Sequence, residues 1–138
     1  RVKVLASPIN PSDLLQIAGN YGVDPVLPAR PGSEGVGRVT EVSADVQALK
    51  VGQLVLLASG SAWAEELVAP AAGFLPLPDL GPVGADVIEQ LAMAAVNPLT
   101  ALLMLTAYTD VTEGQWIAQC RKLCRRGLRH SAGQTAGY

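Results

Sequence analysis

The feature that most constrains the fold is a run of short apolar bursts from Pro31 to Val55, most of them β-branched and separated by glycine. β-Branched residues favour strands, and glycines between them permit tight turns. The segment Lys50-Val51-Gly52 predicts such a turn, because glycine adopts a positive φ without strain. The stretch therefore predicts short twisted strands joined by tight turns.

One acidic residue, Glu34, lies inside the first glycine cluster. Glycine leaves the neighbouring backbone open to close approach, so a carboxylate at this place is a candidate functional group. The alternative is an ordinary solvated carboxylate in a turn. The pattern alone leaves both interpretations open.

Length and composition bound the class of protein. The 138 residues suffice for one domain with a core, and 49% of them are hydrophobic. A net charge of -2 provides no basic field for nucleic acid, and no apolar run approaches a membrane span, so we expect neither partner. Two cysteines exclude a disulfide-dense secreted framework. The chain opens without an initiator methionine or a visible signal peptide, which predicts that it starts inside a longer reading frame.

The remaining segments alternate between strand-like and helix-like patterns. Val2–Ile9 predicts a strand, and Ser12 or Asp13 can cap a short helix over Leu14–Ala18. Phe74–Asp79 is a proline-rich extended segment.

The pattern becomes helical after residue 85. Apolar residues recur on one face of Asp86–Ala95, and Pro98 suits the first turn of a second helix, Leu99–Tyr108. The second helix is apolar nearly all round, so we expect it to be buried. Residues 111–119 predict a turn that leads into a strand.

The order of glycine, acid and valine from Gly32 to Val55 resembles the medium-chain dehydrogenase/reductase superfamily, whose alcohol dehydrogenases carry G-H-E-x-x-G-x-V-x-x-V-G-x-x-V followed by x-x-G-D-x-V. The expected fold class is mainly β with α: a GroES-like partly open barrel, then two helices and the first strand of an incomplete Rossmann domain. Ser33 stands where zinc-dependent members have a histidine ligand, and their preceding cysteine is missing. A serine hydroxyl is a poor zinc ligand, so the resemblance points to the zinc-free branch.

The segment from Ile9 to Gly22, I-N-P-S-D-L-L-Q-I-A-G-N-Y-G, resembles the start of the trans-2-enoyl-CoA reductases of mitochondrial-type fatty acid synthesis. The tyrosine of their G-N-Y-G motif is the proposed proton donor, which implies a catalytic role for Tyr21. Asn10 and Glu34 are expected at the substrate cleft. A phenol can donate a proton, but the residues alone equally describe a packing tyrosine. Quinone oxidoreductases also carry N-P-x-D and an aromatic residue here.

Two later segments extend the resemblance. Trp63 falls in the superfamily pattern G-x-[WY]-A-E, which makes it a candidate wall of the substrate cleft or an ordinary packing aromatic. The segment V-N-P-L-T-A at residues 96–101 resembles V-N-P-x-T-A of the enoyl reductases, whose asparagine contacts NADPH. This implies that Asn97 contacts the cofactor, with Thr100 nearby. Asn97 can also be a helix cap, and the two roles are compatible.

The last segment, 120–138, breaks the pattern: it holds five basic residues, no acidic residue and no apolar periodicity. The family has a glycine-rich turn here, which this chain lacks. We hypothesise a frameshift at or just after Gln119. One alternative is a set of metal ligands, Cys120, Cys124 and His130, which matches no common zinc module. Another is a basic arm for nucleic acid or an anionic surface, although disorder is the better default.

These observations predict a GroES-like substrate domain over 1–84, the start of a nucleotide-binding domain over 85–119, and an aberrant tail over 120–138. The resemblance implies that the full-length parent reduces the 2,3 double bond of 2-enoyl thioesters with NADPH and without zinc. It also implies a homodimer in a bacterial cytoplasm or a mitochondrial matrix. The alternatives are a quinone oxidoreductase and a non-catalytic GroES-like binding module with a basic arm. We expect the 138-residue chain itself to be inactive, to bind NADPH weakly and to expose apolar helix surface.

Overall fold

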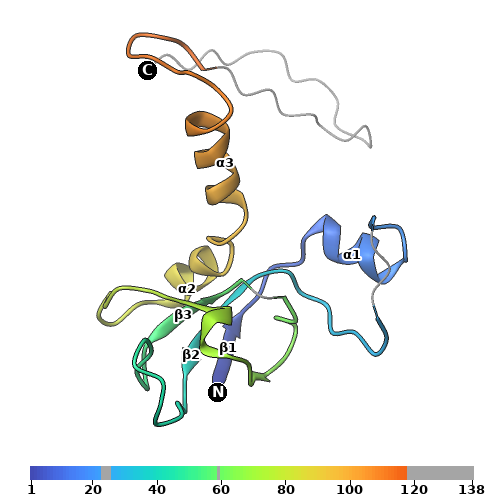
Figure 1. Cartoon of the computed structure of the whole chain (residues 1–138), viewed down its shortest axis with the longest axis vertical. Helices are drawn as coiled ribbons and strands as arrows, with labels where there is room; N and C mark the ends of the chain where they lie inside the picture. Colours follow the sequence, from blue (N-terminus) through green and yellow to red (C-terminus); the bar gives the residue numbers. More distant parts are fainter. Residues whose placement is uncertain (23–25, 59, 118–138) are drawn as a thin grey trace.

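The computed structural model describes residues 1–22, 26–58 and 60–117, and its centre is an antiparallel sheet (Figure 1). The sheet has five strands in the order β4-β1-β2-β3-β5. They are β1 (Val2–Ala6), β2 (Gly35–Val39), β3 (Leu54–Leu57), β4 (Glu66–Leu67) and β5 (Phe74–Pro76). Within the described ranges β4 and β5 pair with one neighbour each, so the sheet is open. The predicted mainly β, partly open architecture is confirmed.

The predicted tight turn between the central strands is also confirmed. Gly52 has a φ of +88°, and the Gln53 amide donates to the Lys50 carbonyl at 3.1 Å. Nothing lies within 4 Å of the place where a Cβ on Gly52 would stand. Glycine is therefore favoured here by the backbone conformation and not by crowding.

Three α-helices and one short 3-10 helix complete the described chain: α1 (Pro11–Ile17), η1 (Ala71–Gly73), α2 (Ala85–Ala92) and α3 (Asn97–Thr106). The first helix begins at Pro11, with Asn10 as its N-cap, so the caps predicted at Ser12 or Asp13 are wrong. Proline suits this position because the first helical amides have no partner inside the helix. Pro98 lies in the first turn of α3, as predicted.

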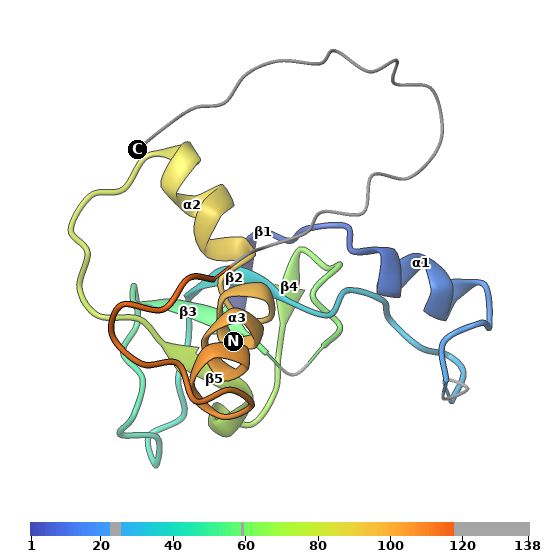
Figure 2. The ribbon, with the colours of Figure 1, turned by 90° about the horizontal axis from the view of Figure 1, so that it is seen from above.

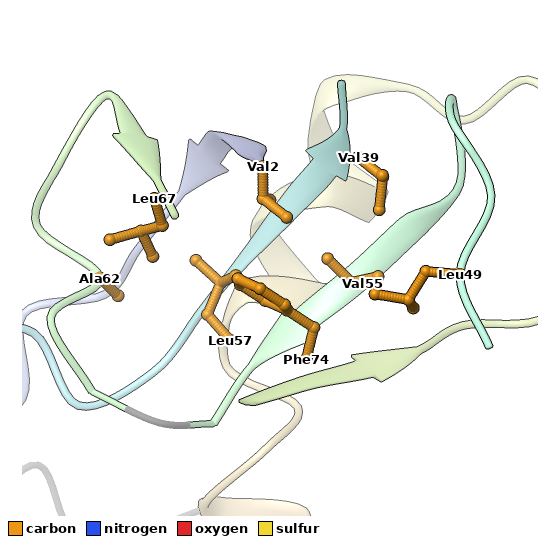
Figure 3. Packing of buried hydrophobic residues seen from close by; sticks show 8 residues of the cluster. All are labelled: Val2, Val39, Leu49, Val55, Leu57, Ala62, Leu67 and Phe74. Carbon is orange, nitrogen blue, oxygen red and sulfur yellow. The ribbon is translucent and has the colours of Figure 1, made fainter. Parts of the chain in front are cut away.

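The sheet separates two hydrophobic cores. The larger one is built from Val2, Val39, Leu49, Val55, Leu57, Ala62, Leu67 and Phe74, whose side chains converge on one face of the strands (Figure 3). The smaller one lies on the other face, where Val36, Leu56 and Ala92 pack with apolar residues of α2. Successive residues of β3 alternate between these cores, as the period of two in a strand requires.

A register shift in β1 divides this strand between the two cores. Val4 pairs with Gly37, but Ala6 pairs with the adjacent residue Val36, so β1 carries an extra residue at this point. Val2 and Val4 contact the larger core, whereas Ala6 contacts the smaller one. Without the extra residue, all three would lie on the same face. The bulge therefore turns the end of β1 toward α2.

Helix α3 is exposed, which corrects the prediction that its apolar composition buries it. It extends away from the sheet in Figure 1, and none of its residues is buried. Leu102 is 56% exposed and Met104 is 59% exposed. Within the described residues no strand or helix packs extensively along this helix, so most of its apolar surface is uncovered. The expectation that this chain exposes apolar helix surface is confirmed.

Residues 111–117, the described part of the strand predicted over 111–119, do not form a strand. The Gln115 amide donates to the Thr112 carbonyl at 3.2 Å, and Gly114 has a φ of +88°, so this segment contains a turn. A parallel strand needs neighbouring strands, and the described part of the chain offers none here. The proposals for Cys120, Cys124 and His130 and the frameshift hypothesis lie outside the described residues.

No single helix in the described ranges is long and apolar enough to cross a membrane. Helices α2 and α3 meet the length and composition criteria only as a pair, and they are bent by 54° at the break between them.

Candidate functional site

The carboxylate of Glu34 joins three separate segments of the chain. Glu34 immediately precedes β2, and its side chain is fully buried. Its Oε1 accepts a hydrogen bond from Asn10 Nδ2 at 3.1 Å, and its Oε2 accepts one from the backbone amide of Val96 at 2.9 Å. The alternative of a solvated turn carboxylate is therefore wrong. Val96 is the N-cap of α3, so Glu34 lies at the start of that helix.

A second buried carboxylate, Asp13, stabilises the neighbouring loop. It accepts hydrogen bonds from the Asn10 amide at 2.8 Å and the Ser33 amide at 3.0 Å. The Ser33 hydroxyl also donates to the same carboxylate. Ser33, which replaces the histidine ligand of zinc-dependent relatives, thus uses its hydroxyl to connect the glycine-rich segment to α1.

Both carboxylates are stabilised by hydrogen bonds from amide and hydroxyl groups and not by basic side chains. In the described part of the chain the only ion pairs join Arg1 to Glu41 and Glu66 at the surface. Asp13 lies in the first turn of α1, and Glu34 contacts the N-cap residue of α3. The positive end of a helix dipole favours an anion at both places. Hydrogen bonds to a carboxylate are stronger than neutral ones, which offsets part of the cost of burial.

The loop of residues 7–10 is anchored from two sides. The Ser7 hydroxyl donates to the Glu34 carbonyl at 2.7 Å, and Trp63 Nε1 donates to the Pro8 carbonyl at 3.1 Å. Gly32 permits this arrangement, because a Cβ at that position would lie 2.5 Å from Trp63 Cδ1. Its φ of +102° also favours glycine. The indole of Trp63 is thereby fixed against the glycine-rich segment.

Three of the predicted site residues meet around this loop. Asn10 and Glu34 are hydrogen-bonded to each other, and Trp63 contacts the loop at Pro8. Trp63 is half-buried, which leaves part of the ring accessible. The expected cleft roles of these residues stay predictions.

The predicted cofactor residues lie at the start of α3. Asn97 is its first residue and is exposed, and the interpretation of Asn97 as the N-cap is wrong because Val96 occupies that position. The Thr100 hydroxyl donates to the Val96 carbonyl at 2.8 Å. The buried Glu34 therefore contacts the residue directly before Asn97.

Tyr21 lies apart from this cluster in hydrogen-bonding terms. It is 52% exposed, and among the described residues it forms no hydrogen bond with Asn10, Trp63 or Asn97. It follows α1, which lies to one side of the sheet, away from α2 and α3 (Figure 2). Its catalytic role stays a prediction.

Sequence reasoning missed Asp13 as a buried residue and Val96 as a partner of Glu34. Asp13 carried a signal, because an acidic residue three positions after Asn10 matches the pattern of a helix N-terminus that bonds back to its own cap. The Glu34–Val96 contact spans 62 positions and involves a backbone amide. Every residue except proline has a backbone amide, so the sequence gives no sign of which amide bonds to Glu34.

Among the residues that the structure describes, no three histidine, cysteine, aspartate or glutamate side chains gather closely enough to hold a metal ion. The expectation of a zinc-free protein rests on the chemistry of Ser33 and stays a prediction.

Comparison with known proteins gives a consistent result. Residues 1–79 match the model of the alcohol dehydrogenase GroES-like domain family. The chain is 39% identical over 120 residues to the mitochondrial enoyl-[acyl-carrier-protein] reductase of Mus musculus, an alignment that covers 86% of this chain and 31% of the relative. The chain thus spans about a third of the length of the curated relatives it matches.

Solved structures agree with this match. The fold is similar to that of the Etr1p complex with NADP and crotonyl-CoA, and to the Etr1p/Etr2p heterodimer of 2-enoyl thioester reductase from Candida tropicalis. For both, the TM-score is 0.69 at 34% identity over 83% of this chain and 36% of the other. A Bacillus thuringiensis protein assigned as an NADPH:quinone reductase has a TM-score of 0.64 at 37% identity, over 78% of this chain and 31% of that one.

Proposed function

This chain belongs to the alcohol dehydrogenase GroES-like domain family, and from that premise we propose that its full-length protein is an NADPH-dependent reductase of 2-enoyl thioesters. The observation that carries the proposal is the 39% identity to an enoyl reductase over 120 residues. An alignment of that length includes most of the segments that hold the candidate residues.

The reaction divides between the cofactor and two side chains of this chain. When bound, NADPH supplies the hydride that is added to the β-carbon of the enoyl thioester. Tyr21 donates its hydroxyl proton to the α-carbon, and its exposure allows a substrate to reach it. Trp63, fixed against Gly32, forms a wall beside the acyl chain.

The start of α3 fits one end of the cofactor. Asn97 is exposed, and its side-chain amide can both donate and accept hydrogen bonds, which suits the carboxamide of a nicotinamide. The Thr100 hydroxyl already donates to Val96, so it remains available as an acceptor. The pyrophosphate and adenosine need a glycine-rich turn and further strands, which residues 1–117 do not contain.

We extend the proposal to the domains and the assembly. Residues 1–84 form the substrate domain, and 85–119 begin the nucleotide-binding domain. The heterodimer of the Candida tropicalis relatives supports a dimer of the full-length protein. The mitochondrial names of the eukaryotic relatives favour the mitochondrial matrix over a bacterial cytoplasm. Serine at position 33 supports a reaction without zinc.

The test is Tyr21→Phe in the protein at its full natural length, with NADPH oxidation measured in the presence of crotonyl-CoA. We expect the turnover number to fall about 100-fold or more, as for loss of a general acid. The matched control is Tyr108→Phe, because Tyr108 is a second exposed tyrosine, and we expect it to leave the rate unchanged. Equal rates for Tyr21→Phe and the unchanged protein would refute the assignment of Tyr21 as the acid.

The second candidate is a quinone oxidoreductase, which the structural similarity to the Bacillus thuringiensis protein favours. A flat quinone accepts hydride without a dedicated proton donor. The same two variants separate the candidates when a quinone replaces crotonyl-CoA. Turnover of quinones alone, unimpaired in Tyr21→Phe, would replace the enoyl reductase proposal with this one.

A further inference from the structure

The buried contacts of Glu34 suggest a role that differs from lining a cleft. We propose that Glu34 is a positioning residue that fixes the start of α3, and therefore Asn97, relative to the loop that leads to Tyr21. The part of the inference that concerns cofactor binding by Asn97 rests on the proposed function. The structural part concerns only the placement of Val96 and can be tested separately.

The first step of the argument is the loop of residues 7–10. Glu34 contacts it twice: its carbonyl accepts from the Ser7 hydroxyl at 2.7 Å, and its Oε1 accepts from Asn10 Nδ2 at 3.1 Å. Asn10 is also the N-cap of α1, and Tyr21 follows that helix by four positions. Glu34 thus helps to fix where the segment with the candidate proton donor leaves the sheet, together with Trp63 and Asp13.

The second step is the contact with α3. The other carboxylate oxygen, Oε2, accepts from the Val96 amide at 2.9 Å. None of the α3 residues is buried, so this end of the helix is held by this hydrogen bond and by Ala94 and Ala95, which pack against the smaller core just before it. The first bond inside the helix runs from the Thr100 amide to the Val96 carbonyl at 3.0 Å, so Val96 is held at both its amide and its carbonyl. Asn97 is the next residue along the chain.

The third step is the energy of this contact. A carboxylate buried without a basic partner is stabilised chiefly by the donors that face it. The Glu34 side chain has only these two hydrogen bonds among the described residues, so moving Val96 away would leave a buried carboxylate oxygen without a hydrogen bond. That penalty resists displacement of the start of α3.

The test is amide hydrogen exchange of the 138-residue chain followed by NMR. Val96 lies at the N-cap, where amides have no acceptor inside the helix. We expect its amide to exchange at least about 10-fold more slowly than that of Leu99, for which the described residues provide no backbone acceptor. Equal exchange of the two amides in the unchanged chain would overturn the proposal, and this measurement requires no variant to fold.

Three substitutions then distinguish positioning from general stability. Glu34→Ala removes the acceptor, and we expect Val96 exchange to rise about 10-fold or more. Glu34→Gln is the conservative rescue: its oxygen can still accept from Val96, because the Asn10 amide can turn over and accept from the new amide group. Asp13→Ala is the matched control, since it deletes a buried carboxylate that does not contact Val96. A comparable rise in Asp13→Ala would show a merely structural effect and overturn the proposal.

The predicted effect of Glu34 on cofactor binding is tested by fluorescence titration of the full-length protein with NADPH. We expect the dissociation constant to rise about 10-fold in Glu34→Ala and to change less than about 3-fold in Glu34→Gln and Asp13→Ala. An unchanged constant in Glu34→Ala would refute the link from Glu34 to Asn97. A full-length protein that lacks reductase activity but shows the predicted exchange of Val96 would refute the proposed function and leave the placement of α3 by Glu34 supported.

Discussion

Strand β3 is entirely apolar and helix α3 is mostly apolar, but β3 is buried along its whole length whereas none of α3 is buried. The strand has a neighbour on each side and a core on each face. The helix is tied to the rest of the described chain at its first turn, through Glu34 and Val96. The difference shows that an apolar segment is buried only where another part of the chain packs against it, whatever its composition.

The largest expected effect compares a leucine from each region. Leu57 is completely buried and Leu103 is 42% exposed. We expect Leu57→Ala to lower the free energy of unfolding by about 3–5 kcal/mol, and Leu103→Ala to change it by less than about 0.5 kcal/mol. Urea denaturation followed by circular dichroism measures both. Similar losses for the two variants would mean that α3 has a packed partner in solution and would break the comparison.

A second comparison uses two glycines with positive φ. A Cβ on Gly32 would meet Trp63 Cδ1 at 2.5 Å and the Trp63 amide nitrogen at 2.6 Å, whereas one on Gly114 would meet nothing within 4 Å. We expect Gly32→Ala to cost about 2 kcal/mol or more, because backbone strain and crowding add. Gly114→Ala bears the strain alone and should cost about 1 kcal/mol. Thermal unfolding of the two variants tests this order, and a smaller loss for Gly32→Ala would contradict the packing of Trp63 on Gly32.

The smallest effect on stability comes from the surface of α3. Leu102→Glu and Leu105→Glu replace exposed apolar side chains, so we expect the free energy of unfolding to change by less than about 0.5 kcal/mol. The same pair should reduce self-association of the 138-residue chain, measured by light scattering, because it interrupts an exposed apolar surface. Val68→Glu is the control: Val68 is 77% exposed just after the edge strand β4 and lies outside this helix. Equal improvement by the control would show that α3 is not the surface responsible.

Much of the fold could be predicted because its signals are local. The glycine at position 52 specified a turn, and Pro98 specified the first turn of a helix. The boundaries were less accurate at α1, where the side chain of Asp13 bonds to the cap of the helix and does not itself form the cap. Local patterns indicate that a helix begins, but the residue at which it begins depends on competing hydrogen bonds.

The candidate site was predictable only in part. Asn10, Glu34 and Trp63 were selected from motifs, and the structure brings them to one loop. The contact that organises them, from Glu34 to the Val96 amide, was not predictable because it joins a side chain to a distant backbone group. The burial of α3 was predicted wrongly for a related reason: a single sequence segment does not reveal whether its partner is present.

The bond between Glu34 and Val96 also sets an order of events during protein synthesis. The last strand of the sheet ends at Pro76, so every strand can leave the ribosome twenty positions before Val96 does. At the usual speed of translation this delay is roughly one to four seconds. Until then the Oε2 atom of Glu34 lacks the Val96 amide as a donor and must stay hydrated. The nascent domain thus keeps a hydrated carboxylate beside its sheet until the N-cap residue of α3 has been synthesised.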